Sequence, residues 1–152
     1  MKAKFGKRAA MLLASTALCA TGTLTAGAGA AHAAVTSFTF KFVHSESNPN
    51  YSFIYAYNNN GALAGYAEFS SNPTNGDPGD AIRAADVLTD GWGIIANLAV
   101  PGGLRTASTI GYNAPFYSLW KTGNLPEGQA YDMSIEVEKD GLYFQWNETV
   151  YS

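Results

Sequence analysis

The chain has 152 residues, a formal net charge of −3, 14% charged residues and one cysteine. An apolar fraction of 47% is enough for a folded core, and the charge balance is not that of a nucleic-acid-binding protein. The sequence has no run of about 20 strongly apolar residues of the kind that spans a membrane.

The first 33 residues predict a secretory signal peptide. An apolar stretch over residues 9–24 follows a basic start, and Ala31-His32-Ala33 gives the small-x-small pattern that signal peptidase accepts. The basic residues are Lys2, Lys4, Lys7 and Arg8. A membrane anchor is the alternative, but Ser and Thr dilute the apolar stretch. We therefore expect export through the general secretory pathway and an extracellular chain that begins at Ala34.

Removal of this segment changes the charge of the protein. Residues 34–152 hold five Lys and Arg against twelve Asp and Glu, so their net charge is −7. An acidic domain of this kind is repelled by nucleic acid and by anionic membrane surfaces, so neither is expected as a partner. Cys19 leaves with the segment, and the mature chain has no thiol and no disulfide.

The remaining chain predicts β-strands in almost every segment, because apolar and polar residues alternate with period two. We expect strands at residues 38–42, 51–57, 62–69, 82–89, 92–100, 104–110, 116–121, 131–138 and 142–151. Asn60-Gly61, Asp90-Gly91 and Asp140-Gly141 are strong turn signals, and residues 70–80 form one long loop. The only helical alternative is a short turn over residues 79–88. Eight or nine short strands predict a single all-β antiparallel sandwich over residues 34–152.

One local motif resembles the tyrosine corner of fibronectin type III and immunoglobulin-like domains. In that corner, a tyrosine at the start of a strand donates its hydroxyl hydrogen bond to the nearby turn backbone. The corresponding residues are Leu125, Pro126, Gly128 and Tyr131. The resemblance implies an immunoglobulin-like sandwich, although the cysteine pair of immunoglobulins is missing.

Three further segments resemble a group of small secreted actinobacterial β-sandwich proteins without an assigned activity. They are Asp90-Gly91-Trp92-Gly93, residues 111–115 (GYNAP) and residues 124–128 (NLPEG). Many members of that group carry a cysteine in the penultimate strand, which this chain lacks. The resemblance implies secretion and a compact β domain, and it implies no chemistry.

The catalytic motifs of common enzyme classes are missing, so we expect a non-catalytic protein. His44 is the one histidine after residue 33, which excludes a histidine-rich zinc site, and we interpret it as a turn residue at a strand end. No phosphate-binding glycine motif and no nucleophile elbow occur, so no cofactor or metal is expected. Calcium binding by the loop at 70–80, with Asp77 and Asp80, is an alternative that lacks the EF-hand spacing.

Aromatic residues are the most prominent candidates for function. In residues 51–58, aromatic side chains alternate with Ser52, Ile54 and Ala56, so one face is core and the other outside. We favour the aromatic side as core; the alternative is an exposed platform that binds sugar or protein. A second candidate binding surface consists of Trp92, Tyr112, Asn113, Phe116, Tyr117 and Trp120.

These observations predict a secreted β-sandwich that acts by surface contact with an extracellular protein or a polysaccharide of the cell envelope. Loops at 70–80 and 111–115 would contribute, because loops on a rigid sandwich commonly carry binding. The alternative is a small inhibitor of a secreted protease that presents residues 110–116 to the enzyme. The absence of disulfides argues against it, since these usually stiffen such loops.

Overall fold

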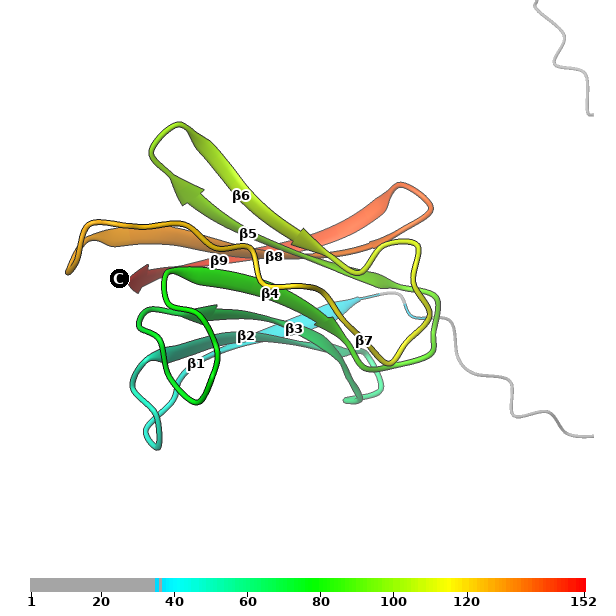
Figure 1. Cartoon of the computed structure of the whole chain (residues 1–152). Coiled ribbons are helices and arrows are strands. Elements are labelled where there is room, and N and C mark those ends of the chain that lie inside the picture. Colours follow the sequence, from blue (N-terminus) through cyan, green and yellow to red (C-terminus); the bar gives the residue numbers. More distant parts are fainter. Residues whose placement is uncertain (1–34, 36) are drawn as a thin grey trace, which may run out of the picture. The chain divides into compact units, whose positions relative to one another are not determined.

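The structure is a computed structural model that describes Val35 and residues 37–152. The predicted signal peptide, with Cys19 and His32, lies outside these residues. In the described part of the chain, every regular element is a strand (Figure 1). The strands are β1 (Phe38–His44), β2 (Tyr51–Asn58), β3 (Leu63–Ser70), β4 (Ala81–Asp86), β5 (Gly93–Val100), β6 (Gly103–Ser108), β7 (Phe116–Tyr117), β8 (Ala130–Lys139) and β9 (Leu142–Tyr151). The predicted all-β fold is therefore confirmed.

The strands form two antiparallel sheets that face each other as a sandwich (Figure 1). The first sheet has the order β1-β2-β3-β4-β7, and the second has the order β6-β5-β8-β9. Strands β1 to β4 form a continuous meander, and the chain then crosses to the second sheet at β5. The short strand β7 returns to the first sheet beside β4 before the chain crosses again to β8.

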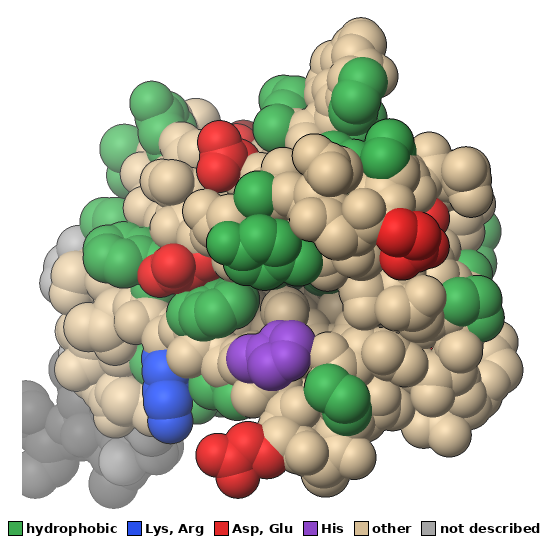
Figure 2. Space-filling model, turned by 90° about the vertical axis from the view of Figure 1, so that its left-hand side faces the viewer, with side chains coloured by type: hydrophobic (Ala, Val, Ile, Leu, Met, Phe, Trp, Pro, Cys, Tyr) green, Lys and Arg blue, Asp and Glu red, His purple; other side chains and the backbone are tan. Residues whose placement is uncertain are grey.

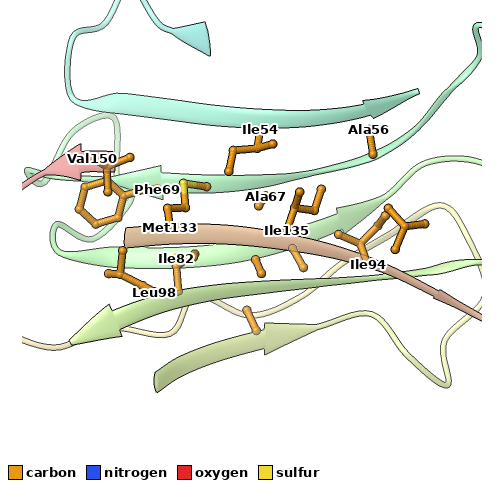
Figure 3. Packing of buried hydrophobic residues seen from close by; sticks show 14 of the residues in the cluster. Ile54, Ala56, Ala67, Phe69, Ile82, Ile94, Leu98, Met133, Ile135 and Val150 are labelled. Carbon is orange, nitrogen blue, oxygen red and sulfur yellow. The ribbon is translucent and has the colours of Figure 1, made fainter. Parts of the chain in front are cut away.

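The core is built from the facing sides of the two sheets and is rich in alanine and isoleucine. Figure 3 shows Ile54, Ala67 and Phe69 of the first sheet close to Ile94, Met133 and Ile135 of the second. Small residues let the sheets approach closely. A Cβ atom built on Gly65 would lie 2.5 Å from Cγ1 of Ile94, so no side chain fits at this position.

The turn chemistry of the sequence explains the tight hairpins. Gly61 has a φ of +77°, which glycine adopts without steric cost, and its amide donates to the carbonyl of Asn58. Asp140 and Gly141 both have positive φ, as the two-residue turn between β8 and β9 requires. The hairpins predicted at Asn60-Gly61 and Asp140-Gly141 are confirmed. The helical alternative for residues 79–88 is wrong, because β4 pairs with β3 along its full length there.

The favoured orientation of residues 51–58 is wrong. Ile54 and Ala56 are completely buried between the sheets, whereas Phe53, Tyr55 and Tyr57 lie on the outer side of the first sheet. The inner side can consist of small residues because Phe38, Phe40 and Phe42 of β1 supply large rings there. The aromatic residues of β2 are therefore free to form an external surface.

The predicted corner has the expected packing without the expected hydrogen bond. Leu125 and Tyr131 are both buried in the core, and Gly128 has a φ of +69° in the turn that also holds exposed Pro126. Within the described residues, the Tyr131 hydroxyl forms no hydrogen bond to the turn. Leu125 is held instead by its amide, which donates to Oδ2 of Asp80 at 2.9 Å.

Candidate functional site

The outer side of the five-stranded sheet is covered by aromatic rings, and we call this surface the aromatic face. The pairing register brings these rings together from β2, β3 and β7 and from the segment after β7. Three polar side chains complete the surface. The aromatic face consists of Tyr51, Phe53, Tyr55, Tyr57, Tyr66, Tyr117 and Trp120, together with Glu68, Asp77 and Arg83.

The rings of β2 and β3 contact one another in a continuous row. The rings of Phe53 and Tyr55 are nearly parallel, with centroids 5.5 Å apart, and Tyr66 packs against both at 5.9 and 5.5 Å. Tyr51 and Tyr57 extend the row at its two ends, with centroids 6.2 and 6.5 Å from their neighbours. Mutual packing leaves the middle rings half-buried, so the row is ordered before any partner arrives.

An ion pair lies in the middle of the aromatic face. Nε of Arg83 on β4 donates to Oε2 of Glu68 on β3 at 2.6 Å, as their direct pairing across the strands allows. The guanidinium also lies 4.4 Å from the ring centre of Trp120 and 5.9 Å from that of Tyr117. Cation–π contacts of this kind orient both rings around a single charged group. Tyr117 is half-exposed, with 51% of its surface accessible to solvent.

The loop at 70–80 is attached to the aromatic face through Asp77. Its Oδ2 accepts a hydrogen bond of 2.7 Å from the Tyr51 hydroxyl, and its Oδ1 accepts one of 3.1 Å from Nε1 of Trp120. Both oxygens are thus used by the protein. The part of the chain that the structure describes has no group of three or more His, Cys, Asp or Glu arranged to hold a metal ion.

The electrostatics of the aromatic face follow from burial of its side chains beside two carboxylates, those of Glu68 and Asp77. Burial raises the pKa of Glu68, and the hydrogen bond from Arg83 offsets this only in part. Burial raises the pKa of Tyr66 to about 12, with a further contribution from the negative charge of Glu68. Burial and the bond to Asp77 likewise raise the pKa of Tyr51 to about 12. These phenols are therefore neutral hydrogen-bonding groups at physiological pH.

The second predicted surface is divided by the fold. Tyr117 and Trp120 belong to the aromatic face, but Tyr112 and Asn113 lie in the loop that joins β6 to β7, and Phe116 is the first residue of β7. There the rings of Tyr112 and Phe116 stack with centroids 4.0 Å apart.

The prediction of Trp92 as a surface residue is wrong, since only 6% of it is exposed. It packs against Phe38 of β1 and Phe144 of β9, and both strands are distant in sequence. Only these long-range contacts show that the Trp92 ring belongs to the core.

Two other candidates have local structural roles. His44 lies at the end of β1, where its Nδ1 is 3.1 Å from Oγ of Ser52, in agreement with its interpretation as a hydrogen-bonded strand-end residue. Residues 110–116 do not form the extended loop of a protease inhibitor. The amide of Tyr112 bonds back to the carbonyl of Thr109, and Gly111 turns the chain with a φ of +86°.

Comparison with known proteins does not assign the chain to a family. The chain matches no family model, no curated protein and no solved structure. Among the described residues there is no helix with the length and apolarity needed to cross a membrane.

Proposed function

We propose that the protein is a secreted, non-catalytic β-sandwich module that binds a neutral extracellular polysaccharide on its aromatic face. The observation that carries this proposal is the row of packed rings across β2 and β3 on the outer side of a sheet, beside which Tyr117 of β7 and Trp120 lie around Arg83. A soluble protein otherwise places so many rings in its core, and an external aromatic surface is typical of a binding site.

The composition of the aromatic face favours a sugar polymer. Tyrosine and tryptophan offer an apolar ring together with a polar edge, which suits a ligand whose C–H groups and hydroxyls lie side by side. The charged side chains of the surface each have a partner on it, since Arg83 donates to Glu68 and Asp77 accepts from Tyr51 and Trp120. These side chains can form hydrogen bonds to the hydroxyls of a bound sugar while each charged group keeps its partner on the protein.

The charge of the protein favours a neutral polymer over an anionic one. The described residues carry five Lys and Arg and twelve Asp and Glu, and the central cation of the aromatic face, Arg83, is already bonded to Glu68. Figure 2 shows the end of the sandwich that bears the loop at 70–80, where Asp and Glu take up more of the surface than Lys and Arg. An anionic polymer would therefore be repelled at low salt.

We propose that the fold is immunoglobulin-like only in the arrangement of its two layers. Two antiparallel sheets face each other as in that family, but β1 to β4 form a meander within one sheet. Immunoglobulin domains distribute their first strands between both sheets. We therefore base the proposed binding mode on the aromatic face alone, and secretion on the leader sequence.

Co-sedimentation with insoluble cellulose and chitin tests the proposal, with insoluble polygalacturonate as the anionic comparison. We expect the protein to sediment with a neutral polymer and to stay in solution with the anionic one. Tyr117→Ala should weaken binding about tenfold, as loss of an interface ring commonly does. Tyr143→Ala is the matched control, because Tyr143 is 65% exposed on the outer side of β9. Absence of binding to both neutral polymers, or equal weakening by the two variants, would overturn the proposal.

A further inference from the structure

A pocket of about 280 Å³ opens between the two sheets at the end of the sandwich opposite the loop at 70–80. This volume is near the lower limit for pockets that hold small molecules, so it suits a ligand of one ring. Its walls combine apolar side chains with the backbone of several glycines. They include Leu88, Trp92 and Ile110 together with Gly91, Gly93 and Gly111.

The pocket contains a buried carboxylate that lacks a cationic partner. In β4, Ile82 and Ala84 point to the core, and the alternation of the strand directs Asp86 to the same inner side. Only 4% of Asp86 is exposed, and its one hydrogen bond within the described residues is a 3.3 Å bond from the Leu88 amide to Oδ1. No Lys, Arg or His nitrogen of the described chain lies within 4.0 Å of it.

The groups around Asp86 do not compensate its charge. Lys139 lines the pocket, but its ammonium donates to the carbonyl of Asp90 at 2.9 Å. Asp90 uses Oδ1 to accept from the Trp92 amide, and its buried Oδ2 has no hydrogen-bond partner. The remaining charged residues of the wall, Glu138 and Asp140, are acidic, and Tyr112 is the other titratable residue there. Burial and the negative charge of Asp90 together raise the pKa of Asp86 to about 6, although the hydrogen bond from the Leu88 amide lowers it.

We propose that this pocket binds a small ligand that carries an ammonium group, with Asp86 as its counter-ion and Trp92 and Ile110 as apolar walls. A buried carboxylate without a partner is costly, and an ammonium supplies both its missing hydrogen bonds and the opposite charge. A neutral hydroxyl would supply only the hydrogen bond. The pocket is separate from the aromatic face, since Asp86 points inward from the sheet whose outer side carries the rings.

Two sugars that differ at one group test this assignment in the whole domain. D-Glucosamine carries an ammonium where D-glucose carries a hydroxyl, so the pair isolates the contribution of charge. Titration of the protein with each, followed by NMR of the backbone amides, locates the binding. We expect glucosamine to shift the amides of Gly93, Thr109 and Gly111 in a saturable manner and glucose to leave them unchanged. Equal responses of these amides to the two sugars, or no saturable shift of them with glucosamine, would overturn the assignment. Shifts on the aromatic face would instead report on the proposed function.

Variants then test the role of Asp86. Asp86→Asn preserves the shape of the side chain and removes the charge, so glucosamine should bind about tenfold more weakly or worse. Asp132→Asn is the control, because Asp132 is exposed on the outer side of β8 and lies outside the pocket. Equal affinity of Asp86→Asn and the wild-type protein would contradict the proposal.

The pH dependence of the wild-type protein gives a second readout that needs no variant. Lowering the pH from about 6.8 to about 5 should protonate Asp86 and weaken binding of glucosamine, whose amine is mostly charged throughout this range. The charged groups that face this site are Asp90 on the turn before β5, and Glu138, Lys139 and Asp140 at the end of β8. Binding that stays constant over this range would argue against Asp86 as the counter-ion.

Discussion

The two sheets of the sandwich have similar inner sides and very different outer sides. Both inner sides bury small and branched apolar residues. The outer side of the four-stranded sheet carries a polar ladder, in which Thr106 donates to Asn97 at 2.6 Å and Asn97 donates to Glu136 at 3.0 Å. The outer side of the five-stranded sheet carries the aromatic face instead. One outer side is thus adapted to water, and the other retains an apolar surface that water covers poorly.

This difference shows which features of an outer side the fold needs for its stability and which it does not. A half-exposed sheet is stable with polar residues outside, as the four-stranded sheet shows. A solvent-exposed side of a sheet therefore does not require rings like those of the aromatic face, and their concentration on one sheet is the basis of the proposed binding.

The largest effect is expected inside β2, where neighbouring residues face opposite directions. Ile54 is completely buried, so Ile54→Ala should lower the free energy of unfolding by about 3 kcal/mol. Tyr55→Ala removes a half-buried ring and should cost clearly less, about 1 kcal/mol. Chemical denaturation of the two variants measures both values. A larger loss for Tyr55→Ala than for Ile54→Ala would place the aromatic side in the core.

A smaller effect is expected from the ion pair of the aromatic face. Arg83→Ala leaves Glu68 buried without its partner, and only 4% of Glu68 is exposed, so the variant should lose about 2 kcal/mol. Glu136→Gln, on the polar side of the other sheet, should stay within about 0.5 kcal/mol of wild type. The double variant Arg83→Ala, Glu68→Gln should recover part of the lost stability, measured by thermal unfolding. No loss in Arg83→Ala would mean that Glu68 finds other partners.

Alkaline pH should affect the aromatic face specifically. The pKa of Tyr51 and of Tyr66 is about 12 in the folded protein, against 10.0 for an ordinary tyrosine. The unfolded chain releases these protons first, so stability is complete below pH 10 and is lost as the pH rises to about 12. Ultraviolet titration of phenolate, with circular dichroism in parallel, checks this. Tyr66→Phe should resist alkaline unfolding better than wild type, and an unchanged profile would count against the buried phenol.

The smallest effects concern single hydroxyls on the two sheets. The Tyr51 hydroxyl donates to Asp77, so Tyr51→Phe should cost about 1 kcal/mol in thermal unfolding. Tyr131→Phe in β8 should change stability by less than about 0.5 kcal/mol, because that hydroxyl has no bond to the turn within the described residues. Equal losses in the two variants would restore the hydrogen-bonded corner that the motif at 125–131 suggests.

The strands could be predicted from the sequence because their signals are local. Alternation and turn residues such as Asn60-Gly61 need no knowledge of distant contacts. Which side of β2 faces the core could not be predicted from the sequence. Ser52, Ile54 and Ala56 are together less apolar than the rings that alternate with them. Their burial depends on the opposite sheet and on the rings that β1 supplies. The pair of Glu68 and Arg83 depends on the register of β3 against β4, which no local pattern encodes.

Binding of a polysaccharide to the aromatic face is tested most directly by mapping a bound oligosaccharide on the protein by NMR. Cello-oligosaccharides and chito-oligosaccharides are soluble forms of the two neutral polymers. If the aromatic face binds the polymer, one of them shifts the amides of β2, β3 and β4 around Tyr55, Tyr66 and Arg83, and leaves those of β5, β8 and β9 unchanged. Shifts confined to the four-stranded sheet, or to the loop that carries Tyr112, would contradict it.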